Sequence, residues 1–261
     1  MADDGRWTLV TGASSGIGAE LARVFAGRGH SLLLTARRED RLATLAAELR
    51  QKHGVAVETL VFDLEDPAAP EALHRALDER GIALHTLVNN AGFGLRGRFA
   101  TLPFDRQAAM VEVNVAAPTK LARLFLPGLV ARRSGGILNV ASTAAFQAGP
   151  SMAVYYATKA YLLSLSEALH EEGKPHGVVV TALCPGPTPT EFSARASLEM
   201  TRLFKLKAMT LSAPEVARQG VEGYEAGKAI VIPGLANRIG AFGAQIGPRA
   251  LGRKIAGKLQ G

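Results

Sequence analysis

Residues 11–18 read TGASSGIG, and this stretch decides the fold. It follows the apolar run 7–10 and precedes an amphipathic stretch over 19–26. Gly12 permits a tight turn, Gly16 lets the backbone approach a pyrophosphate, and Gly18 lets a helix pack closely on the preceding strand. The N-terminus of that helix offers unpaired N–H groups and a positive dipole end to the anion. Because the glycines lie between a strand and a helix, they predict a dinucleotide-binding fold.

The rest of the chain alternates short apolar runs with amphipathic stretches. Continuous apolar runs suit strands that are buried on both faces. They occur at 7–10, 31–35, 55–62, 86–88, 136–140, 178–183 and 229–232. Between them, Leu42, Leu45 and Leu49 share one helical face, and Asp66-Pro67 suits the opening of the third helix. We therefore expect an α/β fold, a doubly wound (Rossmann) parallel sheet of about seven strands with helices on both faces.

The length of 261 residues allows one sizeable α/β domain and is short for two. The sequence shows no linker or repeat, so we expect residues 1–261 to form a single dinucleotide-binding domain. The strand–helix rhythm is broken over about 187–212, and a long segment after a strand end is where a substrate lid would lie. The last part, about 234–261, is a basic extension of two short amphipathic pieces that meet at Gly247-Pro248.

The composition favours a packed protein of a reducing compartment. Apolar residues make up 48% of the chain and charged residues 20%, which argues against disorder. The single cysteine, Cys184, cannot form an intrachain disulfide. The N-terminus is polar and acidic, unlike a signal peptide, and no apolar run approaches the roughly 20 residues that span a bilayer. We expect a cytoplasmic protein.

The net charge of +7 is concentrated near the C-terminus. From Ala226 onward there are six basic residues and no acidic ones, so the first 225 residues carry only +1. The six are Lys228, Arg238, Arg249, Arg253, Lys254 and Lys258. Nucleic-acid binding favours basic groups interleaved with aromatic side chains across a face, a pattern that the bulk of this chain lacks. We therefore expect no nucleic-acid partner.

The end of the second apolar run indicates which dinucleotide binds. NAD-binding folds usually carry an acidic residue there to hold the ribose hydroxyls. Here the sequence is Thr35-Ala36-Arg37-Arg38. A guanidinium can bind a 2′-phosphate through two hydrogen bonds, whereas a carboxylate would repel it. We therefore expect NADP(H), with Arg37 as the main contact; the alternative, that an arginine merely starts the next helix as a solvated charge, is more plausible for Arg38.

Four polar elements follow further along the chain. They are Asn89-Asn90-Ala91-Gly92, Asn114, Ser142 and the pair Tyr155 and Lys159. Tyr155 and Lys159 are four residues apart, so they lie on one helix face, one turn apart. With the glycine stretch, Asp63 and Pro185-Gly186, these elements resemble a short-chain dehydrogenase/reductase over nearly the full chain. The resemblance rests on their number, order and spacing, including Ser142 thirteen residues before Tyr155.

The resemblance implies a role for each catalytic candidate. Tyr155 would be the general acid in reduction and the base in oxidation, and Lys159 would bind the nicotinamide ribose and lower the tyrosine pKa. Ser142 would hold the substrate oxygen, and Asn114 would keep a water in a proton relay. A free tyrosine has a pKa of about 10, and one cation about 4 Å away supplies roughly the 4 kcal/mol that brings it near 7.

The resemblance also implies the cofactor contacts. Asp63 and Leu64 would flank the adenine, Asn90 and Ala91 would contact the adenosine-side ribose, and 185–190 would contact the carboxamide. The family pattern PGxVxT departs here, because Thr188 stands in place of valine and two extra prolines are present. The full set is Gly12, Ser14, Ser15, Gly16, Ile17, Gly18, Arg37, Asp63, Leu64, Asn90, Ala91, Gly92, Tyr155, Lys159, Pro185, Gly186, Thr188 and Thr190.

Each candidate has an alternative interpretation. Ser142 could be a helix cap or turn residue, and Asn114 could bond only to backbone, which is the more plausible reading of that residue alone. Tyr156 also lies within one turn of Lys159, and the family's YxxxK pattern selects Tyr155. Cys184 reads as a core residue. The histidines show no triad spacing, and the chain shows no metal-ligand cluster, so we expect no metal.

The leading functional hypothesis is a carbonyl reductase or alcohol dehydrogenase acting on a small-molecule carbonyl or alcohol. Apolar residues of the lid suggest a hydrophobic or lipid-like substrate; they are Phe192, Leu198, Met200, Leu203, Phe204, Leu206 and Met209. The alternatives are a catalytically silent NADP(H)-binding regulator and a lipid-surface protein on the same fold. The family also implies a homodimer or homotetramer that pairs through helices around 121–131 and 153–172.

The C-terminal extension has two interpretations. The favoured one is a helix that packs over the substrate cleft, with basic residues that suit the helix dipole. In the other, the extension docks on an anionic membrane or an acidic carrier protein. Ile239, Phe242 and Ile246 could share one face of the first piece.

Overall fold

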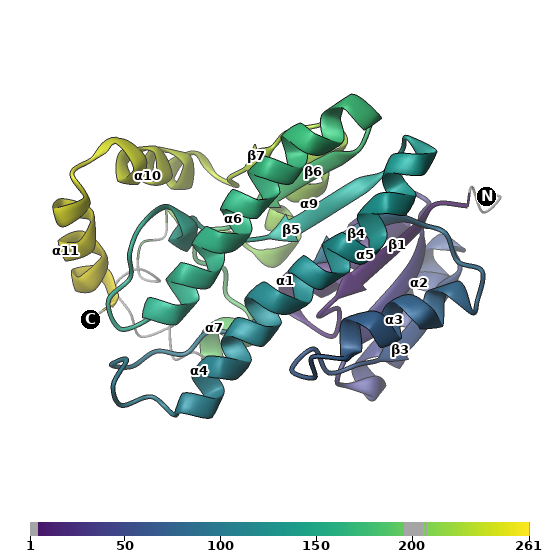
Figure 1. The fold of residues 1–261 in the computed structure, drawn as a ribbon, viewed down its shortest axis with the longest axis horizontal. Coiled ribbons are helices and arrows are strands. Elements are labelled where there is room, and N and C mark those ends of the chain that lie inside the picture. The colour runs from purple at the N-terminus through teal and green to yellow at the C-terminus, as the bar shows by residue number, and fades with distance from the viewer. Residues whose placement is uncertain (1–4, 196–205, 207, 261) are drawn as a thin grey trace.

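The computed structural model describes residues 5–195, 206 and 208–260, and its centre is one parallel sheet of seven strands (Figure 1). The strands run in the order β3-β2-β1-β4-β5-β6-β7. They are β1 (Trp7–Thr11), β2 (Ser31–Ala36), β3 (Val57–Val61), β4 (Leu84–Asn89), β5 (Gly136–Val140), β6 (Val179–Leu183) and β7 (Ile230–Val231). All six strand pairs are parallel. The predicted doubly wound sheet is confirmed.

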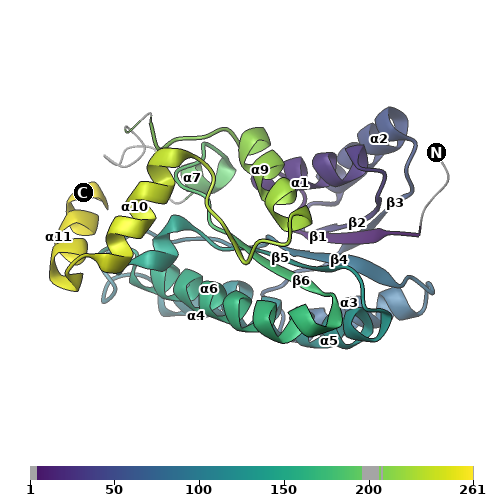
Figure 2. The ribbon, with the colours of Figure 1, turned by 90° about the horizontal axis from the view of Figure 1, so that it is seen from above.

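Helices cover both faces of the sheet (Figure 2). One face carries α1 (Gly16–Gly27), α2 (Glu39–His53) and α9 (Ala213–Glu225). The other carries α3 (Ala69–Asp78), α4 (Phe104–Val111), α5 (Ala117–Arg132) and α6 (Ala153–Gly173). Shorter turns are η1 (Glu112–Ala116), η2 (Thr143–Phe146) and η3 (Lys174–His176). None of the helices in the described part of the chain is long and apolar enough to cross a membrane.

The hydrophobic core is split by the sheet into two layers because successive strand residues point to opposite faces. In β1, Val10 packs toward α1 and α2, where Phe25, Leu42 and Leu49 are fully buried. The neighbouring Leu9 packs on the other layer, which contains side chains of α3 and α5. Strands buried on both faces need apolar residues at consecutive positions, which is why continuous apolar runs predicted them.

The third helix begins later than the sequence suggested. The expectation that Asp66-Pro67 opens it is wrong: α3 begins at Ala69, and Pro70 occupies its first turn. The Asp66 carboxylate accepts a hydrogen bond from the backbone N–H of Ala68 at 2.9 Å. An aspartate bonded to the N–H two residues ahead closes a turn of its own, so the chain makes this turn before the helix starts.

The sheet places its functional edge at the carboxyl ends of β1 and β4. From β1 the order continues outward through β2 and β3, and from β4 it continues the other way through β5. In open α/β sheets, ligands bind in the crevice where the strand order reverses. Three helices of the second half lie beyond this edge, α7 (Glu191–Arg195), α10 (Leu235–Ile246) and α11 (Arg249–Gln260) (Figure 1).

Candidate active site

The glycine stretch forms a turn that is braced from the end of β4. Gly12 and Gly16 have φ of +65° and +57°, which side chains rarely adopt. The Asn90 amide donates to the carbonyls of Thr11 at 2.9 Å and Gly12 at 3.2 Å. A Cβ on Gly18 would collide with that amide and with the Gly12 carbonyl. The glycines are therefore required by close backbone packing, and Asn90 has a structural role beside its predicted cofactor contact.

Thr11 is a site residue that the sequence interpretation missed. Its hydroxyl accepts hydrogen bonds from the backbone N–H groups of Asn90 and Ala91, both at 3.0 Å, and donates to Val88 O at 3.2 Å. These bonds fix the Asn90-Ala91-Gly92 segment against the glycine turn. The signal was present, since Thr11 directly precedes Gly12, but a threonine at a strand end is too common to be singled out.

Two adjoining cavities lie at this edge. The first, of about 340 Å³, runs from Gly12 to Tyr155. The second, of about 260 Å³, lies on the β2–β3 side and is lined by Ser14, Arg37, Asp63 and Leu64 among others. Every predicted cofactor-binding residue lines one or both cavities. The structure therefore brings the predicted cofactor residues together.

The two arginines after β2 hold different positions. Arg37 bonds to Glu65 at 3.0 Å and its side chain is 54% exposed. Arg38 is 29% exposed and donates to the hydroxyls of Ser14 and Ser15, each at 2.9 Å, and to Glu191 at 2.7 Å. The interpretation of Arg38 as a solvated charge is wrong. The glycine turn folds back over the end of β2, so it supplies acceptors that sequence spacing does not show.

Tyr155 and Ser142 meet in the larger cavity. Ser142 follows β5 and accepts a hydrogen bond from the N–H of Ala144 at 3.1 Å, so it caps η2. Its hydroxyl is also hydrogen-bonded to the phenol of Tyr155, which is on α6. The alternative of a helix cap is thus correct but incomplete, because the same side chain faces the tyrosine.

Lys159 reaches the same place one turn further along α6. Its ammonium donates to Val140 O, at the end of β5, at 2.7 Å, and lies 5.9 Å from the centre of the Tyr155 ring. A Cβ on Gly92 would lie 3.6 Å from Lys159 Nζ and 3.0 Å from Asn114 Oδ1. The lysine and Asn114 therefore converge on Gly92, and a Cβ there would be crowded by the Asn114 amide.

Burial controls the titration of both groups. It raises the pKa of Tyr155, and the Ser142 hydrogen bond opposes that rise. Burial lowers the pKa of Lys159 to about 8. The expectation that Tyr155 has a pKa near 7 is wrong for the protein alone. Removing the phenolate from water destabilises it by more than the nearby groups stabilise it. The phenol therefore holds its proton at neutral pH.

Asn114 lies in η1, a π-helical turn between α4 and α5. Its Oδ1 accepts from the N–H of Phe93 at 3.1 Å, and its Nδ2 donates to Phe93 O at 3.0 Å and to Thr158 Oγ1 at 3.1 Å. The alternative interpretation was that Asn114 bonds only to backbone. The structure shows these backbone bonds and one further bond, to the Thr158 hydroxyl. The wide turn tips the side chain toward Phe93, so Asn114 holds the loop after β4 against α6.

The segment after β6 forms the remaining wall. Thr188 is buried and donates to Gly186 O at 3.1 Å. The Thr190 side chain lies against Gly16, where a Cβ would approach it to 3.2 Å. Phe192 of α7 packs on Tyr155 with ring centres 5.5 Å apart. Met209 lines the cavity, whereas the lid residues Leu198, Met200, Leu203 and Phe204 lie outside the described residues.

Asn237 of α10 is a second residue that the sequence interpretation missed. It is buried, lines the larger cavity and packs directly on Gly186. Its Nδ2 donates to Met209 O and Pro233 O, while its Oδ1 has no hydrogen-bond partner among the described residues. The hydroxyl of Thr35, in the smaller cavity, is likewise buried without a partner there. Both are acceptors that a bound molecule can use.

The remaining candidates have no catalytic arrangement. Cys184 is buried and unpaired, and burial raises the pKa of its thiol to about 12, as expected of a core residue. Within residues 5–195, 206 and 208–260, no three histidine, cysteine or carboxylate side chains gather as a metal site would require.

Comparisons with known proteins agree with this geometry. The family model described as short chain dehydrogenase matches residues 6–201. A very-long-chain 3-oxoacyl-CoA reductase of Coprinopsis cinerea is 38% identical over 183 residues, which cover 69% of this chain and 53% of the relative. The chain thus spans about half the length of that curated relative.

Solved structures extend the likeness over most of the chain. A Sphingobium yanoikuyae short-chain dehydrogenase in complex with NADPH is 37% identical, with a TM-score of 0.82 and 91% coverage of both chains. A Burkholderia phymatum short chain dehydrogenase/reductase in complex with NAD is 28% identical, with a TM-score of 0.80, and covers 93% of this chain and 94% of that one.

The lowered pKa of Lys159 predicts a pH-dependent stability. The unfolded chain keeps this proton up to the ordinary pKa of 10.5, whereas the folded protein releases it near pH 8. Between these values the unfolded state holds more of this proton, so the contribution of Lys159 to the free energy of unfolding should rise with pH by about 1.4 kcal/mol per unit. Denaturant unfolding between pH 7 and 10 measures this rise: the free energy of unfolding of the wild type should increase with pH relative to that of Lys159→Met. A constant difference would show that the buried lysine stays charged.

Proposed function

The chain belongs to the short-chain dehydrogenase family, and we propose that it is an NADP(H)-dependent oxidoreductase that transfers a hydride between nicotinamide and the carbonyl or secondary alcohol carbon of a hydrophobic, lipid-like substrate. The observation that carries the proposal is the convergence of Tyr155, Ser142 and Lys159 on one cavity that continues to the glycine turn. A regulator without catalysis would not need a buried lysine beside a buried tyrosine.

The cavities fit a nicotinamide dinucleotide. The turn between Gly12 and Gly18 lets a pyrophosphate reach the N-terminus of α1. Thr35 Oγ1 and Asn237 Oδ1 are buried acceptors without partners among the described residues, and they lie in the smaller and the larger cavity, respectively. Amino and carboxamide N–H groups are the donors that such acceptors need. Asn237 therefore joins 185–190 as a candidate for the nicotinamide end.

The side chains supply the proton chemistry of carbonyl reduction. When bound, NADPH supplies the hydride. Tyr155 donates the proton that the substrate oxygen needs, and its raised pKa keeps that proton in place at neutral pH. Ser142 donates a hydrogen bond to the same oxygen as negative charge develops. The ammonium of Lys159, held on Val140 O, stabilises the phenolate that remains.

Replacing Tyr155 by phenylalanine tests the proton donor. We expect Tyr155→Phe to lower kcat for carbonyl reduction by about 10²–10⁴-fold, because the general acid is lost. Cofactor affinity should stay within a few-fold. Tyr156→Phe is the matched control and should keep most of its activity. NADPH absorbance measures both against aldehydes, aromatic ketones, 3-oxoacyl thioesters and ketosteroids; equal losses in the two variants would remove the special role of Tyr155.

The arginines after β2 support NADP(H) as the cofactor. No acidic residue stands at the end of β2, and Arg37 and Arg38 both line the smaller cavity. Arg37 is the more exposed of the two, so its guanidinium is accessible to a 2′-phosphate. Arg38 braces the glycine turn through Ser14 and Ser15 and adds positive charge. We assign the main phosphate contact to Arg37, and a bracing role to Arg38.

Alanine variants separate these two roles. Arg37→Ala should weaken NADPH binding by about 10–100-fold, the loss of a charge-assisted bond, and leave NADH binding nearly unchanged. Arg38→Ala should weaken both cofactors, because the glycine turn loses its brace. Titration of each variant with NADPH and NADH measures the dissociation constants, with Arg80→Ala as a distant control. An Arg37→Ala variant that loses both cofactors equally would contradict 2′-phosphate recognition.

A hydrophobic substrate fits the outer part of the larger cavity. Its lining there is largely apolar and includes Met152, Phe192, Met209 and Ile255. The reductase from Coprinopsis cinerea is named for a very-long-chain 3-oxoacyl substrate, which has a long apolar tail. Apolar walls bind such a tail because its transfer from water is favourable. We therefore place 3-oxoacyl thioesters and bulky ketones first among the substrates to test.

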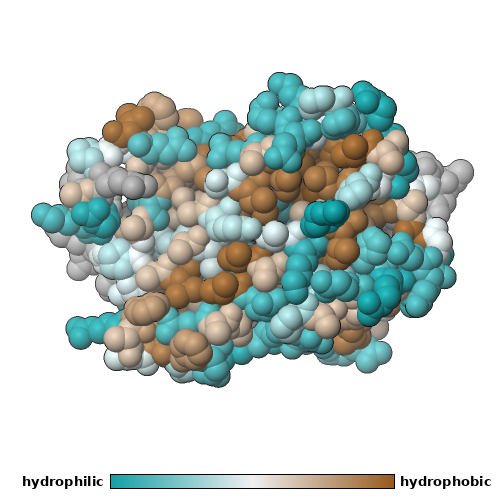
Figure 3. Space-filling view, viewed as in Figure 1, coloured by the Kyte–Doolittle hydropathy of each residue, from teal (hydrophilic) through white to brown (hydrophobic). Residues whose placement is uncertain are grey.

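A homodimer or homotetramer remains a prediction that surface composition supports. Figure 3 shows apolar side chains gathered between α5 and α6, in the middle of the face that it displays. Tyr161 of α6 is among the exposed large side chains. Apolar patches of this kind on a protein surface commonly mark subunit contacts. Light scattering of the purified protein should give a multiple of 27.4 kDa; the mass of one chain would rule this pairing out.

A further inference from the structure

Helix α10 carries its large apolar side chains on the outside. The outward residues Leu235, Ile239, Phe242 and Ile246 are between 62% and 71% exposed. At 3.6 residues per turn they fall within an arc of about 60°. The opposite face has the small or polar residues Asn237, Gly240, Ala241 and Ala244, which line the larger cavity. In a helix of a water-exposed surface the apolar stripe normally faces the core, so this helix is inverted.

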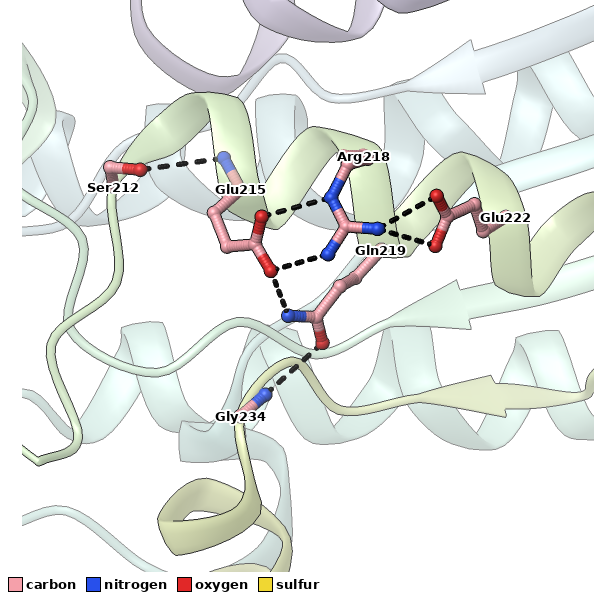
Figure 4. A network of polar contacts seen from close by, with 6 residues as sticks. All are labelled: Ser212, Glu215, Arg218, Gln219, Glu222 and Gly234. Atoms are coloured by element: carbon pink, nitrogen blue, oxygen red, sulfur yellow. Dashed lines mark hydrogen bonds and ion pairs between the residues drawn. The ribbon is translucent and has the colours of Figure 1, made fainter.

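The orientation of α10 is fixed by polar contacts at its start. Asn237 is buried and donates to Met209 O at 3.0 Å and to Pro233 O at 2.9 Å. The N–H of Gly234 donates to the amide oxygen of Gln219 on α9 (Figure 4). Gln219 is in turn bonded to Glu215. Turning the helix to bury its apolar stripe would break the Asn237 bonds and push Ile239 and Phe242 into the cavity wall.

The surroundings of the stripe are basic. Residues 235–260 contain five basic side chains and no acidic one. Of these, Arg238, Arg253 and Lys254 are exposed. Figure 3 shows apolar side chains at the upper left edge, where α10 lies, with α11 beside it in Figure 1. An apolar stripe on α10 with exposed basic side chains on α10 and on the following helix α11 matches a surface that is apolar within and negatively charged at its rim.

We propose that the outer face of α10 docks onto an anionic lipid bilayer, with its apolar stripe in the headgroup–acyl boundary and the exposed Arg238, Arg253 and Lys254 on the phosphates. Helices that bind membrane interfaces combine a large apolar face with lysine and arginine beside it. A second copy of the chain fits less well, because two-fold pairing through this face would oppose basic residues to basic residues. An acidic protein would complement the basic residues but would not explain why the exposed stripe of α10 is apolar.

The docked orientation would bring the larger cavity to the membrane. Its wall is formed by the inner face of α10 and by Ile255 of α11, so the cavity lies directly behind the docking face. This consequence rests on the proposed function, since it concerns how a lipid-like substrate arrives. The docking itself does not rest on catalysis, and it is measured without substrate or cofactor.

Vesicle co-sedimentation tests the docking. Wild-type protein should bind vesicles with about one-third phosphatidylglycerol in phosphatidylcholine, bind pure phosphatidylcholine weakly, and lose affinity several-fold in roughly 0.5 M salt. Ile239→Gln with Phe242→Gln should lower the partition coefficient by about tenfold or more, because two apolar side chains no longer leave water. The control is Phe104→Gln, which removes an 85% exposed phenylalanine of α4 and should bind like the wild type.

A charge-reversed pair tests the electrostatic part. Arg253→Glu with Lys254→Glu should abolish the preference for phosphatidylglycerol. Lys52→Glu with Arg75→Glu changes the net charge equally on exposed positions of α2 and α3 and should keep it. Unfolding midpoints of all variants check that the fold is intact.

Three results would overturn the proposal. The first is wild-type protein that does not sediment with phosphatidylglycerol vesicles. The second is Gln and Glu variants that bind these vesicles as the wild type does. The third is light scattering without lipid in which Ile239→Gln with Phe242→Gln breaks an oligomer, which would assign the face to a second copy.

Discussion

The ammonium group of Lys159 lies buried at the carboxyl end of β5. Removing this charge from water is unfavourable, so the site must supply hydrogen-bond acceptors that stabilise it. One backbone carbonyl, Val140 O, accepts from it at 2.7 Å, and Gly92 lies beside it, where a Cβ would be 3.6 Å from Nζ. Without such partners a buried cation loses its proton, and burial here already lowers the pKa to about 8. The lysine is therefore charged at neutral pH by a narrow margin. Any loss of backbone order at the end of β5 would remove that margin, because the Val140 carbonyl would no longer accept from the ammonium.

A continuous set of contacts joins the two cavities. Arg38 holds Ser14 and Ser15 of the glycine turn on one side and Glu191 on the other. Glu191 begins α7, and the next residue, Phe192, packs on Tyr155. A group that attracts Arg38 in the smaller cavity thus competes with Glu191 for the same guanidinium. Because Glu191 and Phe192 are adjacent in α7, the position of Phe192 is tied to what occupies the β2–β3 side. This is a physical route by which the adenosine end of a dinucleotide can influence the wall of the reaction site.

The sequence was most informative where burial alone determines structure. Each strand lies within about two residues of an apolar run, because a strand covered on both faces needs apolar residues throughout. Tyr155 and Ser142 followed from the resemblance to the family's motifs, since spacing alone does not separate Tyr155 from Tyr156. Other features depend on contacts between distant segments. The start of α3 differs from the expectation because Asp66 bonds to Ala68, and Arg38 braces the glycine turn because that turn approaches it.

The tyrosine pKa was misjudged because spacing shows the nearby lysine and does not show the loss of water, which here has the larger effect. Asn237 was missed because a lone asparagine near the C-terminus has no pattern.

The inverted helix α10 is the feature that folding explains least. Its inner face is accounted for, since small residues make room for the cavity and Asn237 anchors the turn before it. Its outer face is not, because side chains that stay exposed in the folded state contribute little hydrophobic stabilisation. Polar residues at positions 235, 239, 242 and 246 would serve the fold equally well and would lower the tendency to aggregate.

Four apolar residues on one narrow arc, beside a segment free of acidic groups, therefore point to a second medium besides water, such as a lipid bilayer, that the helix meets after the protein has folded. Under the proposed function, the cavity wall would have an apolar substrate on one side and this medium on the other, so the substrate would have little water to cross.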